Sequence, residues 1–320
     1  MQRIPLKIKK YCLGKWNGFV EKMKHTSFPG FDKIPIYDVA IFFREEIKRD
    51  MIPLRASAMS FNFLLAIFPS IIFIFTLIPF IPVKGLDLII DKFFFDVLPQ
   101  SGYNFLHSTI MDITSIQRGG LLSLGFVLAF YFSTNGVRMM MLAFNKQHII
   151  YRQRGFWRRR FAAFRLTLYL FVLFIASVFL IIAGDHVIDL IGNWTGWQNS
   201  TERFILQALQ WLIIIFLFFG GVSLIYYFGP SMKERRRLIT PGSTFATLGS
   251  ILASLGFAYF VNNFDLYNEV YGSIGTLIVL MIWLNINSIV LLVGFEINNS
   301  IDVNRDLRIY ASAEANATKS

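Results

Sequence analysis

Cysteine is almost absent from the sequence: Cys12 is the only one, and it lies in a basic N-terminal stretch. This excludes a disulfide framework and a thiolate metal site. Charge is scarce too, because only 16% of the 320 residues are Asp, Glu, Lys or Arg, against roughly 25% in an average soluble domain. Together with a hydrophobic content of 55%, this deficit indicates that much of the surface faces something other than water.

The sequence also lacks a set of side chains that would carry catalysis. Its four histidines are scattered, and the topology predicted below puts His25 and His148 on one side of a membrane and His107 and His186 on the other. No closely spaced His, Asp or Glu set has metal-ligand spacing, and no Ser or Cys nucleophile motif is present. We therefore expect no metal, no cofactor and no enzymatic activity.

Six long uncharged stretches fill most of the chain. A membrane span needs about 20 apolar residues, and the stretch between Arg55 and Lys84 alone has 28. These stretches predict an all-α membrane domain over residues 34–302, between a basic N-terminal tail, 1–33, and a C-terminal tail, 303–320, both loosely ordered. The predicted spans are about 56–82, 119–138, 166–184, 204–228, 240–263 and 272–296.

Basic residues lie in alternate connecting segments, and this alternation predicts the orientation. One set of segments contains 27 of the 31 Lys and Arg residues, whereas the other contains only Lys84, Lys92, Arg118 and Arg203. Because loops rich in Lys and Arg stay in the cytoplasm, we expect both termini to be cytoplasmic. The same clusters are compatible with binding anionic lipid headgroups. Since no recognition module accompanies the charge, we expect no nucleic-acid partner.

Two further stretches have the pattern of amphipathic helices. In one, residues 36–47, the apolar positions recur at helical spacing and Glu46 and Arg49 are placed on the opposite face; the other covers residues 86–97. Each pattern fits a helix lying in the membrane interface, and equally a helix packed against the bundle.

The fifth span has small residues at every fourth position. Such a face lets helix backbones approach closely, so this span lies either at the centre of the bundle or at a dimer seam. The positions are Gly242, Ala246, Ser250, Ser254 and Ala258.

Polar side chains inside the spans are mainly amides. Asn62 precedes the helix-kinking Pro69 in the first span, and Asn285 and Asn287 lie near the middle of the sixth. Interior amides bond neighbouring helices together or line a substrate path, and both interpretations stay open. Arg138 and Glu296 stand where their spans end, either extended to the interface or paired across the inner mouth of a cavity.

Three segments together resemble the YihY/BrkB family of bacterial inner-membrane proteins. They are RASAMSFNFLLAIFPSIIF at 55–73, the Arg-rich STNGVRMMMLAFNKQHIIYRQRGFWRRRFAAFRLT at 133–167, and YGSIGTLIVLMIWLNINSIVLLVGFEINNSI at 271–301. The Pro241-Gly242 pair that opens the fifth span fits the same pattern. Asn135, Arg138, Trp283 and Glu296 fall within these motifs.

The resemblance implies a six-helix fold in the inner membrane. It also implies a role in the cell envelope, because members are linked to serum resistance or to export of lipopolysaccharide precursors, and the old label ribonuclease BN is regarded as mistaken. We expect a transporter or flippase of an amphipathic, lipid-linked substrate, with membrane lipids as partners and a homo-oligomer or envelope proteins as further ones. The alternative is a scaffold that transports nothing. The expected substrate path includes Asn62, Pro69, Asn135, Arg138, Trp283, Asn285, Asn287 and Glu296.

Overall fold

A computed structural model describes most of the chain as α-helices. It describes residues 21–27, 30–32, 34–80, 117–146, 151–152, 154–195, 200–232, 237–263 and 265–317. The amphipathic stretch at 86–97 and most of the N-terminal tail lie outside these residues. Six helices in the described part are long and apolar enough to cross a membrane. They are α3 (Ile52–Leu77), α6 (Gly119–Ala143), α7 (Phe156–Thr195), α8 (Ser200–Phe228), α9 (Pro241–Asn263) and α10 (Asp265–Ala317).

These six helices match the six predicted spans, but four of the helices are longer. α7 begins at Phe156 rather than near residue 166, and α6 continues to Ala143. A charged residue ends a membrane span without ending the helix, because Arg is itself a good helix former. For the same reason α10 runs through residues 303–317, so the prediction of a loosely ordered C-terminal tail is wrong there.

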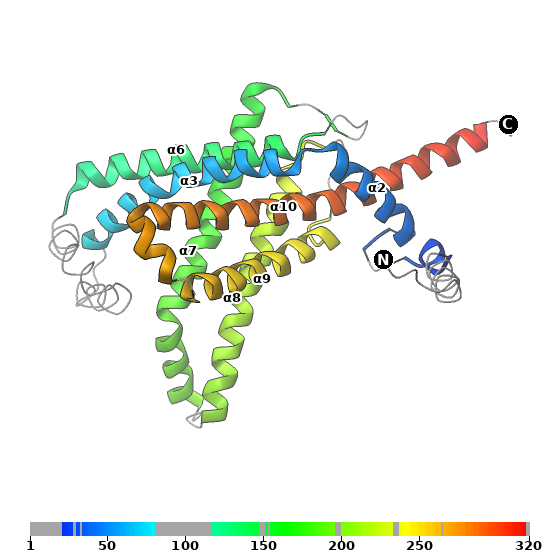
Figure 1. The fold of residues 1–320 in the computed structure, drawn as a ribbon. Coiled ribbons are helices and arrows are strands. Elements are labelled where there is room, and N and C mark those ends of the chain that lie inside the picture. The colour runs from blue at the N-terminus through cyan, green and yellow to red at the C-terminus, as the bar shows by residue number, and fades with distance from the viewer. Residues whose placement is uncertain are drawn as a thin grey trace, which may run out of the picture.

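The helices pack as neighbours in chain order. α3 lies against α6, α7 against α8 and α9 against α10, and α10 also packs on α3. In Figure 1 the α7–α8 hairpin runs across the direction of α3, α6 and α10. Its contacts with them include the Phe130–Phe164 ring pair, 5.0 Å between centroids, and a hydrogen bond of 2.7 Å that the Tyr226 hydroxyl donates to the Leu291 carbonyl.

The main hydrophobic core lies at one end of this bundle. Its members include Met59 near the start of α3, Phe144 after α6, Leu166 of α7, Tyr226 of α8 and Phe295 of α10. We call this the basic end, because it holds the start of α7 with its arginines and the other segments predicted to be cytoplasmic. Away from this end, the described parts of the six helices expose large apolar side chains, as a surface that meets lipid requires.

α2 (Ile36–Arg49) precedes α3 and packs on α10. Its buried residues are Val39 and Glu46, which are seven positions apart and therefore share one helix face. The prediction that Glu46 lies opposite the apolar face is thus wrong. Of the two interpretations of this stretch, packing against the bundle is confirmed.

Candidate functional site

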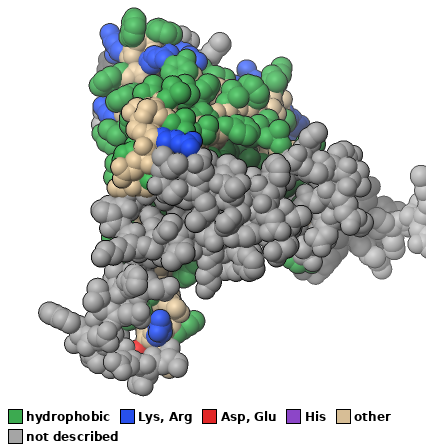
Figure 2. Space-filling view, turned by 90° about the vertical axis from the view of Figure 1, so that its left-hand side faces the viewer, with side chains coloured by type: hydrophobic (Ala, Val, Ile, Leu, Met, Phe, Trp, Pro, Cys, Tyr) green, Lys and Arg blue, Asp and Glu red, His purple; other side chains and the backbone are tan. Residues whose placement is uncertain are grey.

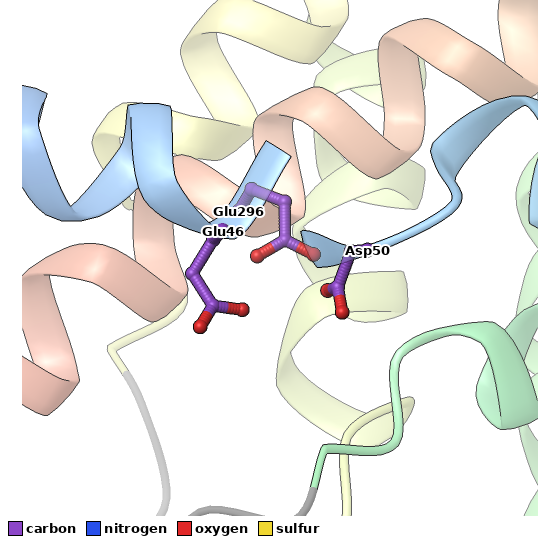
Figure 3. A group of neighbouring side chains, drawn as sticks. All are labelled: Glu46, Asp50 and Glu296. Carbon is purple, nitrogen blue, oxygen red and sulfur yellow. The ribbon is translucent and has the colours of Figure 1, made fainter. Parts of the chain in front are cut away.

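Three carboxylates from distant parts of the chain meet at the basic end. Glu46 and Asp50 come from the end of α2 and Glu296 from α10, and one oxygen of each lies within 4.8 Å of the others (Figure 3). Glu46 is 4% exposed and Glu296 is 1% exposed. Burial of charge at this depth is costly unless every charge is paired.

Lys146, just after α6, supplies the central counter-charge. Its Nζ lies 2.7 Å from Glu46 Oε2 and 2.7 Å from Glu296 Oε1, and it also contacts Asp50 Oδ2. Arg55 of α3 pairs with Asp50 at 3.0 Å. We call these five residues the ionic network. It fastens α2, α3, the end of α6 and α10 to one another.

Polar neighbours complete the network on the α10 side. The Asn299 amide donates to Glu296 Oε2 at 3.4 Å, and the Tyr151 hydroxyl donates to Asn299 Oδ1 at 2.7 Å. Tyr151 is itself held by a backbone bridge to Met232. The connection between α6 and α7 and the one after α8 therefore meet at the same place.

This cluster corrects the expectation that no acidic set has metal-ligand geometry. Spacing along the chain could not reveal it, because Glu296 is 250 positions from Glu46. The three oxygens have a separation that suits a cation, but the Lys146 ammonium already lies among them. The arrangement is therefore that of an ion-pair network. A spacing of four residues between Glu46 and Asp50 on an amphipathic helix was the one local signal.

The predicted amides bond in two different ways. Asn285 of α10 donates to Ser57 Oγ at 3.2 Å and to Ser60 Oγ at 3.4 Å, so it joins α10 to α3. Asn62 and Asn287 instead donate to carbonyls of their own helices, those of Ala58 and Trp283. Pro69 lies inside α3 without ending it.

Arg138 and Glu296 do not pair within the described residues, where Lys146 neutralises Glu296. The Arg138 side chain is half-buried, and its Nε atom is buried without a hydrogen-bond partner. Asn135, one turn earlier in α6, is also half-buried. Neither residue belongs to the ionic network.

The small-residue face of α9 packs on α10 at the basic end. Gly242, Ala246 and Ser250 are buried, and an added Cβ on Gly294 of α10 would lie 2.7 Å from the Gly242 carbonyl. Farther along, Ser254 accepts a hydrogen bond from Trp283 Nε1 at 3.2 Å. Ala258 is exposed, so the close approach ends before it.

Aromatic and basic side chains are interleaved at the start of α7. Phe156 is 62% exposed and Trp157 79%, and Arg158 is exposed beside them. Arg160 lies over the Tyr131 ring of α6, 5.6 Å from its centroid. We call Phe156, Trp157, Arg158 and Arg160 the α7 rim. Their combination of Trp, Phe and Arg is typical of the membrane–water interface.

The six apolar helices and the clustering of charge at one end define a polytopic α-helical membrane protein. A family model described as "Virulence factor BrkB" matches residues 43–318, and the chain belongs to this family. This result confirms the resemblance inferred from the three sequence segments.

Bacterial relatives match most of the chain. "Putative ribonuclease-like protein YfkH" of Bacillus subtilis is 29% identical over 250 residues, which are 76% of this chain and 88% of the relative. A "UPF0761 membrane protein" of Tolumonas auensis is 26% identical over 280 residues, 83% of this chain and 87% of the relative. No solved structure matches.

Proposed function

We propose that this protein moves an amphipathic, lipid-linked envelope substrate across the bacterial inner membrane, as a transporter or flippase. The observation that carries the proposal is the α7 rim, where the exposed rings of Phe156 and Trp157 lie beside the exposed Arg158 and the half-buried Arg160 at the basic end. Each basic residue near the surface contributes about 1 kcal/mol to attraction of an anionic lipid. Membrane lipids with anionic headgroups are therefore the proposed ligands.

The surroundings of the rim support a lipid-like substrate. In the coloured upper part of Figure 2, Lys and Arg side chains lie among hydrophobic ones. A substrate with acyl chains could stay in the bilayer beside such a surface while only its headgroup crosses. The residues that α7 and α8 contribute to the main core, including Ala163, Leu166 and Tyr226, lie near the basic end.

Polar groups for the headgroup would come from α3, α6 and α10. Asn285 with Ser57 and Ser60 forms a polar seam in otherwise apolar walls, and Arg138 brings an incompletely bonded guanidinium from α6. The same hydrogen bonds would serve a scaffold through packing alone. The two functions differ in whether loss of these groups changes transport or only stability.

The test is translocation of a fluorescent anionic phospholipid in vesicles that contain the purified protein. Asn285→Leu and Arg138→Gln should each slow translocation severalfold at normal membrane levels. Ile286→Leu, a lipid-exposed neighbour, and Arg118→Gln, at the opposite end of α6, serve as matched controls and should translocate normally. Unchanged rates in both test variants would remove these residues from the mechanism. No translocation by the unsubstituted protein would favour the scaffold.

We do not propose a ribonuclease, although a relative's name contains the word. Among the described residues the only three-carboxylate set encloses Lys146, whose ammonium stands where a catalytic metal would have to bind. A hydrolytic metal site needs open coordination positions for water and substrate.

A further inference from the structure

A shallow hollow lies at the basic end, where the end of α6, the start of α7 and the segment after α8 meet. It measures about 150 Å³, its open mouth included. Two of its described lining residues are arginines and none is acidic; they are Met141, Asn145, Arg154, Arg159, Gly229 and Ser231. The described part of the hollow therefore combines two positive charges with neutral polar groups.

Hydrogen bonds between these three segments fix the shape of the hollow. The Ser231 hydroxyl donates to Asn145 Oδ1 at 2.7 Å, and the Arg152 backbone N–H donates to the Ser231 carbonyl at 2.7 Å. The Arg154 guanidinium donates to three carbonyls at the end of α8. The polar groups around the hollow are therefore in place before a ligand arrives, which lowers the entropy cost of binding.

The half-buried Arg159 has hydrogen-bond donors that no protein group accepts. Its Nη2 atom donates to the Arg154 carbonyl at 3.1 Å, whereas its Nε atom is buried without a hydrogen-bond partner. No carboxylate of the described residues forms an ion pair with Arg159, and the Asn145 Nδ2 atom has no acceptor there either. A partly buried charge without a partner is unfavourable, and an anion placed against it would remove the penalty.

Phosphate is the anion that fits these donors and this position. A guanidinium presents its N–H groups in a planar fork that matches the oxygens of a phosphate group. The exposed rings of Phe156 and Trp157 belong to the same helix start as Arg159, and such rings are typical of the membrane–water interface. The anions concentrated at that depth are the phosphate groups of anionic lipids.

We propose that this hollow binds a phosphate group through Arg159 and Asn145, with Arg154 adding its positive charge, and we call it the phosphate site. The phosphate group belongs to the headgroup of an anionic phospholipid or to free phosphate, because both offer the same oxygens. Bound there, it holds the end of α6, the start of α7 and the end of α8 together. The proposal takes its class of ligand from the proposed function, but binding does not require transport. Failure of the translocation assay would therefore leave the phosphate site standing.

The test is thermal unfolding of the purified protein in a neutral detergent, with each ligand titrated at constant ionic strength. The ligands are inorganic phosphate, a short-chain anionic phospholipid, and the diacylglycerol with the same chains but no phosphate. A ligand that binds only the folded state raises the unfolding midpoint in a saturable way. We expect the phospholipid to do so and the diacylglycerol to have no effect. Equal stabilisation by inorganic phosphate would identify free phosphate as a sufficient ligand, and stabilisation by the phospholipid alone would identify the lipid headgroup.

Three variants separate the phosphate site from general surface charge. Arg159→Gln should raise the half-saturating concentration of the stabilising ligand about tenfold or more, because it removes charge-assisted hydrogen bonds. Arg152→Gln is the matched control: it removes the same charge from an exposed side chain of the same connecting segment, and it should change that concentration by less than about twofold. Asn145→Asp puts a carboxylate into the hollow, where it would neutralise Arg159 and repel phosphate, so the stabilisation should disappear.

Three results would overturn the phosphate site. They are the absence of saturable stabilisation by either phosphate ligand, equal stabilisation by the diacylglycerol, and equal half-saturating concentrations for the Arg159→Gln and Arg152→Gln proteins. If Arg159→Gln does not fold, Asn145→Asp takes its place in the comparison. Should neither fold, the unsubstituted protein decides: saturable stabilisation by a phosphate ligand but not by the diacylglycerol supports the proposal, and any other result refutes it.

Discussion

At the basic end, individual side chains form hydrogen bonds with the backbone groups at helix ends. Asn298 of α10 accepts a hydrogen bond from the Gly242 backbone N–H at 2.9 Å and donates to Thr240 Oγ1 at 2.9 Å, so it caps α9 from a different helix. Arg154 caps the end of α8 in the same way. Its guanidinium donates to the carbonyls of Phe228, Gly229 and Pro230 at 3.0–3.3 Å. Helix ends that lack such partners are unstable when shielded from water.

We expect Arg154→Lys to destabilise the protein by about 1–3 kcal/mol, because an ammonium cannot reproduce the planar fork that reaches three carbonyls. Thermal unfolding in detergent measures the loss. Arg158→Lys is the matched control: its side chain is exposed, and surface changes of this kind stay within about 0.5 kcal/mol. Equal stability of both variants would show that the Arg154 contacts contribute nothing to the α8 end.

At the scale of elements, the backbones of α9 and α10 approach each other closely where the small-residue face of α9 packs on α10. A Cβ on Gly242 would lie 2.6 Å from Asn298 Cγ and would also collide with the Gly294 carbonyl, whereas a Cβ on Gly256 would meet nothing within 4 Å. Gly242→Ala should therefore force α9 away from α10 and cost about 1–3 kcal/mol. Gly256→Ala should be neutral or slightly stabilising, because Ala favours the helix. Size-exclusion profiles after heating in detergent compare the two, and an equally stable Gly242→Ala protein would contradict the close approach.

The sequence predicts features that depend on residues close together in the chain, and it does not predict contacts between residues that are far apart in the chain. Uncharged length is a local property, so all six spans could be predicted. Helix ends are predicted less accurately, because residues 138–165 with their arginines are expected to form a connecting segment, whereas α7 already begins at Phe156. The ionic network was missed because Glu46, Lys146 and Glu296 come together only when three helices pack. The amide Asn285 was recognised as unusual, but its partners Ser57 and Ser60 could not be named without the α3–α10 contact.

In the whole molecule, the clustered charged side chains and the main hydrophobic core lie at the same end. The main core, the ionic network and the α7 rim all lie at the basic end, while the other ends of the helices mostly expose apolar side chains. That asymmetry fits the proposed transport, because an anionic headgroup would be attracted to the basic end.

The orientation of the molecule is the remaining whole-molecule prediction. The split of 27 basic residues against four predicts that the basic end faces the cytoplasm, because loops rich in Lys and Arg resist translocation. Reporter fusions after Ile150 and Arg235 should therefore be cytoplasmic, and fusions after Gln100, Thr195 and Tyr267 external. Ile150, Arg235 and Gln100 lie outside the described residues, so these fusions test the topology independently of the structure. A cytoplasmic signal from the fusion after Gln100 would contradict the alternation on which the six-span topology depends.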